Sequence, residues 1–258
     1  MKKTPTALRP EEFPAPLRRY LGGRVYDSSS SPEARVWFLP DADLYVKRAA
    51  RGTLKKEAEM TSFFHKIGLS VEVLAYLSEE EDWLLTTAAD GEDATAPLYL
   101  ADGRRLAATL GEALRALHET EAFGCPVPDR TGDYLRTVEE NAARGSFDPT
   151  FLPEGMSLSR EMALATLRDA APALTSRVLL HGDFCLPNIL LRGWRVTQFI
   201  DLGGGGIGDR HIDLFWGAWT LRYNLGTDRY RDEFFSAYGR EMVDPALLRA
   251  VAAAECFG

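Results

Sequence analysis

The pattern of hydrophobic and polar positions divides the chain into a strand-rich first part and a helix-rich second part. Short apolar runs bounded by turn residues predict strands at residues 22–26, 34–39, 44–47, 71–77 and 83–87. Between the third and fourth of these runs, apolar residues recur at helical spacing over 53–67, and Gly68 follows where a helix would end. The first part is therefore predicted to be a small β-rich unit with one helix.

From residue 90 onward the periodicity is mostly helical. Apolar positions from Leu106 to Leu117 lie on one face of an amphipathic helix. Further helices are predicted at 134–143, 159–170, 213–221, 229–238 and 245–257, with a strand at 177–180 and a hairpin formed by 189–191 and 196–200. This order predicts an α+β fold with an N-terminal lobe at 1–89, a larger α-rich lobe at 90–258 and a cleft between them.

Composition narrows the class of protein. The chain has 258 residues, of which 45% are hydrophobic and 26% charged, values typical of soluble globular proteins. The N-terminal segment has lysines but no apolar core of a signal peptide, and no apolar stretch is long enough to span a bilayer, so we expect a cytoplasmic protein that does not bind membranes.

The net charge of −8 disfavours binding to nucleic acid and is compatible with a cationic substrate. The cysteines, Cys125, Cys185 and Cys256, are odd in number and lack metal-ligand spacing, which predicts free thiols in a reducing compartment. No partner base accompanies Cys185, so we expect no chemistry from it.

The candidate chemistry lies in the run HGDFCLPN, residues 181–188, and in FIDLG, residues 199–203. Asp183 could aim and deprotonate a hydroxyl nucleophile, while Asn188 and Asp201 provide the oxygen ligands that Mg²⁺ prefers beside a nucleotide. Taken singly, either aspartate could be a turn or cap residue. The three together predict a phosphoryl-transfer site.

Lys47 ends a predicted buried strand, where its charge requires a partner. The next helix carries Glu57 and Glu59, and a lysine–glutamate pair of this kind orients nucleotide phosphates in kinases. The alternative is a surface salt bridge, which would contribute little.

His181 is expected to orient the loop rather than to act as a base. The serine run 28–31 is expected to be a hairpin turn, although its backbone could also meet phosphates.

These motifs resemble the aminoglycoside phosphotransferase family, and its 3′-phosphotransferases most closely. The HGDFCLPN, FIDLG and GDRHIDL segments carry the resemblance, together with LYVK at 44–47, KKEAEM at 55–60 and AECF at 254–257. It covers most of the chain and implies a two-lobed protein-kinase-like fold with a helical insertion at about 132–176.

The resemblance also implies roles for particular residues. It places Asp183 as the catalytic residue, and Asn188 and Asp201 as magnesium ligands. Nucleotide-binding positions would be Ser31, Tyr45 for adenine stacking, Lys47 with Glu57, and the hinge backbone at Thr87 and Ala89. Substrate-binding positions would be Glu255 and Phe257 near the C-terminus, with Glu154, Asp148 and Asp228 as further carboxylates for the ammonium groups of the drug.

The chain departs from the family pattern at three places. Gly204, within the glycine run 203–206, stands where the family usually has arginine, which removes a cation beside the site and is expected to loosen the loop. Ala254 reduces the family's acidic pair to Glu255 alone, and Gly258 follows the usual terminal Phe257. These changes put efficiency and drug range in doubt more than reaction type.

The predicted function is transfer of the γ-phosphoryl group of ATP or GTP, with Mg²⁺, to an aminoglycoside hydroxyl, most plausibly the 3′-hydroxyl, by a monomer or weak homodimer. Two alternatives remain open. One is a kinase of the same fold that acts on a choline-like amine, a sugar adduct or a macrolide. The other is a nucleotide-binding pseudokinase without activity.

Overall fold

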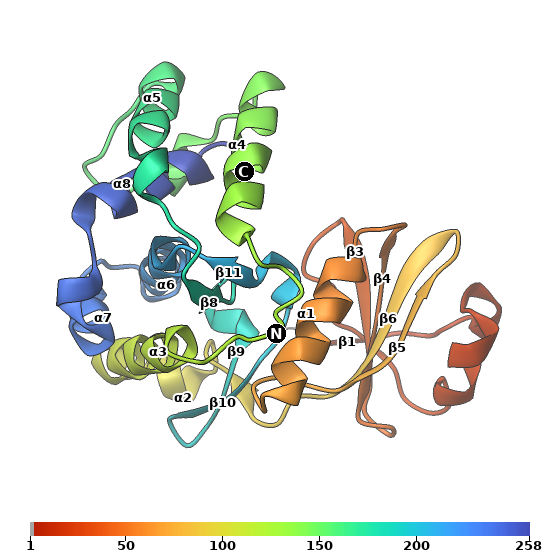
Figure 1. Cartoon of the computed structure of the whole chain (residues 1–258). Coiled ribbons are helices and arrows are strands. Elements are labelled where there is room, and N and C mark those ends of the chain that lie inside the picture. Colours follow the sequence, from red (N-terminus) through yellow and green to blue (C-terminus); the bar gives the residue numbers. More distant parts are fainter. Residues whose placement is uncertain (1–2) are drawn as a thin grey trace.

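A computed structural model describes residues 3–258 and shows a strand-rich part and a helical part side by side (Figure 1). The strand-rich part is one antiparallel sheet of six strands in the order β1-β2-β3-β4-β6-β5. The strands are β1 (Thr4–Pro5), β2 (Tyr26–Asp27), β3 (Ala34–Leu39), β4 (Leu44–Ala50), β5 (Val73–Ser78) and β6 (Glu81–Thr87). This arrangement confirms the predicted β-rich N-terminal lobe.

One face of the sheet is covered by the chain's own N-terminal segment. Phe13, which follows the 3₁₀ segment Pro10–Glu12, and Leu17, in the 3₁₀ segment Ala15–Tyr20, pack with Trp37 and Trp83 into a small core. The predicted strand at 22–26 was wrong in extent, since only Tyr26–Asp27 pairs with β3. Gly23 has φ of +90°, a left-handed conformation that interrupts an extended strand.

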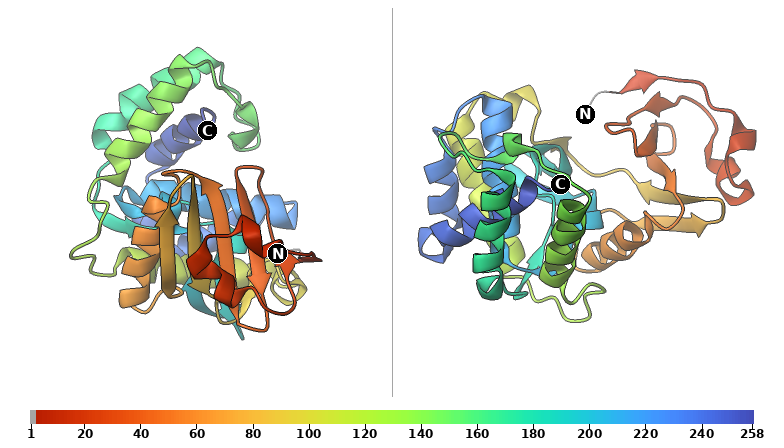
Figure 2. Two further views of the ribbon diagram at one scale, coloured as in Figure 1. Left: turned by 90° about the vertical axis from the view of Figure 1, so that its right-hand side faces the viewer. Right: turned by 90° about the horizontal axis from the view of Figure 1, so that it is seen from above.

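Helix α1 (Lys55–Lys66) joins the sheet to the helical part. Its buried Met60, Phe63 and Phe64 belong to the core of the helical part rather than to the core of the sheet. The right-hand view of Figure 2 shows α1 between the two parts. Its position fixes the distance between β4 and the loops of the second part.

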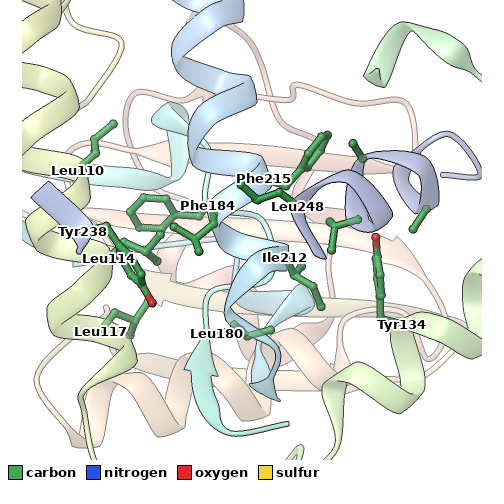
Figure 3. Close-up of a cluster of buried hydrophobic side chains, with 14 of the residues drawn as sticks. Leu110, Leu114, Leu117, Tyr134, Leu180, Phe184, Ile212, Phe215, Tyr238 and Leu248 are labelled. Atoms are coloured by element: carbon green, nitrogen blue, oxygen red, sulfur yellow. The ribbon is translucent and has the colours of Figure 1, made fainter. Parts of the chain in front are cut away.

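The helical part surrounds one large hydrophobic core, of which Figure 3 shows a section. Its helices are α2 (Pro97–Leu100), α3 (Gly103–His118), α4 (Arg130–Ala143), α5 (Arg160–Ala170), α6 (Arg210–Leu225), α7 (Arg231–Tyr238) and α8 (Pro245–Glu255). Aspartate or serine side chains accept hydrogen bonds from the first turns of α3, α4, α5, α6 and α8, as N-caps do. Across residues 3–258, the helices lack the length and apolar character needed to span a membrane.

Short strands in the helical part carry the candidate site. The predicted hairpin forms from β9 (Ile189–Arg192) and β10 (Arg195–Phe199), and β7 (Glu92–Asp93) pairs with β9. Sequence reasoning missed β11 (Gly206–Gly208), which pairs antiparallel with β8 (Val178–Leu180). The loops that follow β8 and β10 therefore lie next to one another.

Candidate active site

The loop after β8, residues 181–188 and here called the catalytic loop, is anchored by a fully buried carboxylate. Asp213 on α6 accepts hydrogen bonds from the backbone N–H groups of His181, at 2.8 Å, and Gly182, at 2.7 Å. Its Oδ2 also lies 3.2 Å from Nε2 of His118. Hydrogen bonds to an ionised acceptor are among the stronger ones in proteins. Asp213 therefore fixes the backbone immediately before Asp183.

His118 completes this anchor and is itself fully buried. Burial lowers the pKa of His118, so the imidazole is neutral near neutral pH. A neutral ring satisfies both neighbours when its Nε2–H donates to Asp213 and its Nδ1 accepts from the Tyr238 hydroxyl, 2.8 Å away. This agrees with a structural role for His118.

Asp183 and Asn188 are in direct contact within the catalytic loop. The Asn188 amide nitrogen lies 2.8 Å from Oδ2 of Asp183 and 3.1 Å from its backbone oxygen. Nδ1 of buried His181 accepts a hydrogen bond from the Asp183 backbone N–H at 3.3 Å, and its ring packs edge-on against Phe184 and Phe199. His181 thus holds the loop, as expected, and the Asp183 carboxylate is held by its neighbour.

Lys47 links the sheet to the second part through two carboxylates. Its Nζ lies 2.7 Å from Oε2 of Glu57 on α1 and 2.9 Å from Oδ1 of Asp201 after β10. Burial alone would lower the pKa of Lys47, but the two carboxylates outweigh it and raise the pKa. The predicted choice of Glu57 is confirmed, since Glu59 faces Lys55 at the surface. The alternative of a surface salt bridge does not fit a lysine with 19% of its side chain exposed.

Asp201 sits in a left-handed backbone conformation, with φ of 60°, at the start of the glycine run. A non-glycine residue in this region is uncommon, and such strain concentrates at functional sites. The turn directs the Asp201 side chain to Lys47. The 3₁₀ turn Leu202–Gly204 follows and leads into β11.

The glycine run makes a close backbone contact with the catalytic loop. A Cβ atom on Gly204 would lie 2.8 Å from the Gly182 oxygen, and one on Gly182 would lie 1.8 Å from the Gly204 oxygen. The glycines therefore allow the two loops to touch. Nε of Arg130 also donates to the Gly204 oxygen at 2.6 Å, so a guanidinium from α4 lies beside the position where the family has arginine.

Asn188 and Asp201 provide hard oxygen donors suited to Mg²⁺. The Asn188 amide nitrogen is used by Asp183, which leaves its amide oxygen available, and the Ile200 N–H donates to the Asn188 backbone oxygen at 3.0 Å, which holds the two segments together. Within residues 3–258, no group of three or more His, Cys, Asp or Glu side chains forms a metal cage. Mg²⁺ in nucleotide sites is commonly held by one or two protein oxygens plus phosphates, so this donor set fits the ion.

The predicted nucleotide positions lie on β4 and at the end of β6. Tyr45 and Lys47 share the face of β4 opposite to buried Val46, and the Tyr45 ring stacks on Phe38 with centroids 4.7 Å apart. At the hinge, Thr87 donates its N–H to Glu72, whereas the N–H of half-buried Ala89 has no partner in residues 3–258. Of these two hinge positions, Ala89 is thus the one with a donor available for a base.

Ser31 is exposed, at the tip of the turn between β2 and β3. Within that turn, the Ser28 N–H donates to Val36 and the Ser29 hydroxyl accepts from the Val36 N–H. The serine run therefore forms the hairpin turn that was favoured.

Glu255 is a buried carboxylate within electrostatic reach of Asp183. It is 7% exposed, and its Oε1 accepts from the Tyr134 hydroxyl at 2.9 Å. Burial raises the pKa of Glu255 to about 7, and the nearby Asp183 charge adds to the rise, while Tyr134, Arg130 and Trp216 oppose it. A buried carboxylate beside the catalytic loop is suited to an ammonium group.

The other predicted substrate positions differ in surroundings. Phe257 is 1% exposed and packs on Phe147, so its ring is a core residue. Asp148 caps the 3₁₀ turn Pro149–Phe151, and Asp148 and Glu154 are both exposed. Asp228 lines a cavity of about 210 Å³ together with Arg222, Arg231 and Arg249, a positive setting that disfavours a cation. Asp148 nevertheless lies next to the C-terminal segment, because its N–H donates to the Cys256 oxygen at 2.6 Å.

The thiol within the catalytic loop is inert. Burial, and then the charge of Asp183, raise the pKa of Cys185 well above its ordinary value. This agrees with the expectation of no cysteine chemistry.

Sequence reasoning gave no role to Asp213, Arg130 or Tyr134. Asp213 was part of the GDRHIDL segment, and its position a few residues beyond the glycine run was the only available signal. Arg130 and Tyr134 lie one helical turn apart at the start of α4, a spacing that any surface helix might show. Their importance follows from the fold alone.

Comparison with known proteins identifies related enzymes. Residues 11–251 match the phosphotransferase enzyme family. A probable aminoglycoside 3′-phosphotransferase from Lactococcus lactis is 45% identical over 96% of both chains, and one from Niallia circulans is 29% identical over 76% of both.

Solved structures show the same fold. An aminoglycoside phosphotransferase from Streptomyces rimosus superposes with a TM-score of 0.74 at 26% identity, over 89% of this chain and 91% of that one. The same enzyme has been solved with ADP and streptomycin. A type VIII aminoglycoside-3′-phosphotransferase gives a TM-score of 0.68 at 30% identity, over 90% of this chain and 91% of the other.

The fold and the Lys47–Glu57–Asp201 cluster define a kinase-like phosphotransferase. The chain belongs to the phosphotransferase enzyme family.

Proposed function

We propose that this protein transfers the γ-phosphoryl group of ATP or GTP to the 3′-hydroxyl of an aminoglycoside and thereby confers antibiotic resistance. The observation that carries the proposal is the bridge from Lys47 to both Glu57 and Asp201, next to the contact between Asp183 and Asn188. The choice of acceptor is supported by the relative from L. lactis, a probable aminoglycoside 3′-phosphotransferase at 45% identity.

Each residue has a defined task in this reaction. Lys47, held by Glu57, binds the α- and β-phosphates, and Tyr45, Thr87, Ala89 and, in the turn before β3, Ser31 form the nucleotide side. Mg²⁺ would be held by Asn188 and Asp201, and when bound it offsets phosphate charge. Asp183 accepts the proton of the drug hydroxyl, and the hydroxyl oxygen of the drug forms a bond to the γ-phosphorus. The bond between the γ-phosphorus and the β,γ-bridging oxygen breaks, which releases the nucleoside diphosphate.

The drug is proposed to bind through carboxylates on the acceptor side. Glu255 is the principal one because it is buried near Asp183. Asp148, Glu154, Asp228 and the C-terminal segment at Phe257 are proposed as secondary positions. Asp148 and Glu154 are exposed, Asp228 lies among arginines, and the Phe257 ring is buried in the core. We further propose a lobe boundary at residues 89 and 90, a cytoplasmic location where nucleotides and reduced thiols coexist, and a monomer or weak homodimer without nucleic-acid or membrane partners.

A purified-protein assay tests the function. Magnesium ATP or GTP is supplied with kanamycin, neomycin, streptomycin, choline, or an aminoglycoside that lacks the 3′-hydroxyl, and nucleoside diphosphate is measured by a coupled assay. We expect turnover only with drugs that carry the 3′-hydroxyl, and phosphorus NMR of the product should place the phosphate there. Turnover with choline alone, or nucleotide binding without transfer to any acceptor, would refute the proposal in favour of the two alternatives.

A further inference from the structure

The glycine run is held from outside by the start of α4. The Ile207 N–H donates to the Val127 oxygen at 2.8 Å, and the Asp209 N–H donates to the Thr131 hydroxyl at 2.8 Å. Between these two bonds, Nε of Arg130 donates to the Gly204 oxygen at 2.6 Å. Residues on both sides of Arg130 are therefore tied to the segment that follows the glycine run.

Arg130 lies close to the reacting loop. The Gly204 oxygen that it contacts rests against Gly182, which directly precedes Asp183. The Arg130 guanidinium is also within electrostatic reach of Glu255, whose carboxylate in turn senses Asp183. Its carbon Cζ lies 5.9 Å from the ring centre of Tyr134, the hydrogen-bond donor to Glu255. Arg130 thus shares its surroundings with both acceptor-side carboxylates.

Within the described part of the chain, the positive charge of Arg130 is not balanced by an ion pair, unlike that of Lys47. Lys47 forms ion pairs with Glu57 and Asp201, which neutralise its charge. Arg130 has no carboxylate within ion-pair distance among residues 3–258, and its Nη1 and Nη2 donate to no residue of that range. A γ-phosphoryl group that approaches Asp183 and Glu255 adds negative charge to negative charge, and a fixed cation nearby reduces that repulsion.

We propose that Arg130 is a positioning residue for phosphoryl transfer: it holds the Gly203–Gly204 turn against the catalytic loop, and its charge offsets the carboxylates of Asp183 and Glu255. The inference rests on the proposed function. In this proposal Arg130 on α4 provides the positive charge that an arginine at position 204 would provide in the family. Arg130 acts through the Gly203–Gly204 turn and through the electrostatic potential that it creates at the carboxylates of Asp183 and Glu255.

Two substitutions separate its charge from its hydrogen bond. Arg130→Gln keeps a donor for the Gly204 oxygen and removes the charge, whereas Arg130→Lys keeps the charge. Arg144→Gln is the matched control, because Arg144 ends the same helix, is 71% exposed and pairs with Glu140 at 3.6 Å. Thermal unfolding of each variant shows whether it folds.

Kinetics are measured at about pH 8.5, where Glu255 is ionised. We expect Arg130→Gln to lower kcat by about 10- to 100-fold, in the range of lost electrostatic stabilisation. The KM for the drug should stay unchanged or fall, since a more negative pocket attracts a cation. Arg130→Lys should recover most of the rate. A purely structural role would instead raise both KM values, and it would leave Arg130→Lys as impaired as Arg130→Gln; that result, or an unchanged kcat in Arg130→Gln, overturns the inference.

The two proposals fail separately. If the wild-type protein phosphorylates no aminoglycoside, the proposed function falls, and Arg130 is then tested through slow hydrolysis of magnesium ATP with water as acceptor. Slower hydrolysis in Arg130→Gln than in Arg144→Gln supports the role of Arg130, and equal rates overturn it. Absence of both reactions in the wild-type protein overturns both proposals.

Discussion

Glu255 is expected to make the stability of the protein fall as the pH rises. Burial raises the pKa of this carboxyl from 4.5 to about 7. Between these two values the folded state keeps a proton that the unfolded state has lost, so the free energy of unfolding decreases with pH. At 1.36 kcal/mol per pKa unit, the loss is about 3 kcal/mol and is complete above about pH 7.

The groups that face Glu255 set the size of this effect. Tyr134 and Arg130 approach from α4, Trp216 from α6 and Asp183 from the catalytic loop. Glu255→Gln keeps an oxygen that can accept from Tyr134 and removes the ionisation. The variant should therefore match the wild-type protein near pH 4.5 and exceed its stability by about 3 kcal/mol at pH 8.

Urea unfolding followed by tryptophan fluorescence from pH 4.5 to 8 measures the difference. Glu154→Gln, at an exposed position, is the matched control and should follow the wild-type curve. Parallel pH curves for the wild-type protein and Glu255→Gln would show that Glu255 is not held in an environment that disfavours its charge.

A drug with ammonium groups should also release a proton from Glu255 on binding at about pH 6. Calorimetry in buffers of different ionisation enthalpy detects this proton release.

Three further substitutions test the catalytic loop. Asp183→Asn should lower kcat by ~10²–10⁴ with little change in nucleotide affinity, since it acts on the acceptor; a loss of nucleotide binding, measured by fluorescence titration, would contradict its assignment. Gly204→Arg should lower kcat rather than restore a missing cation, because its Cβ would lie 2.8 Å from the Gly182 oxygen, and faster turnover would show that the loop accommodates the side chain. Asp213→Asn should cost about 3–5 kcal/mol in urea unfolding, because a buried charge that accepts two loop N–H groups is lost; a cost below about 1 kcal/mol would show that the anchor is dispensable.

The sequence was sufficient to predict the elements that carry local patterns. Lys47 and Glu57 lie on a strand and on the helix that follows it, and strand and helix periodicity together with the resemblance pointed to their pair. Asp183, Asn188 and Asp201 came from two short motifs, residues 181–188 and 199–203, joined by the predicted hairpin. Helix ends were less accurate: α6 extends over Arg210–Leu225 rather than 213–221, because the Asp209 cap and the Gly226 end lie outside the apolar pattern.

The parts that escaped prediction depend on contacts between distant residues. Arg130 and Gly204 are 74 positions apart, and the arginine side chain on its own looks like an ordinary helix-surface residue. Phe257 was expected to meet the substrate, yet its ring packs on Phe147, since the chain end folds into the core. Asp228 was chosen for its charge, whereas the fold also places Arg222, Arg231 and Arg249 around the same cavity.

The contact between Gly182 and Gly204 has a consequence for the evolution of drug range. A Cβ atom on either residue would come closer to the backbone of the other than real Cβ atoms do, so a substitution at either position requires one of the two loops to shift. Asp148, Pro149, Thr150 and Glu154, the exposed positions of the segment 148–154, carry no such restriction. Laboratory selection for new substrates should therefore accumulate changes in that segment and leave the glycine pair untouched.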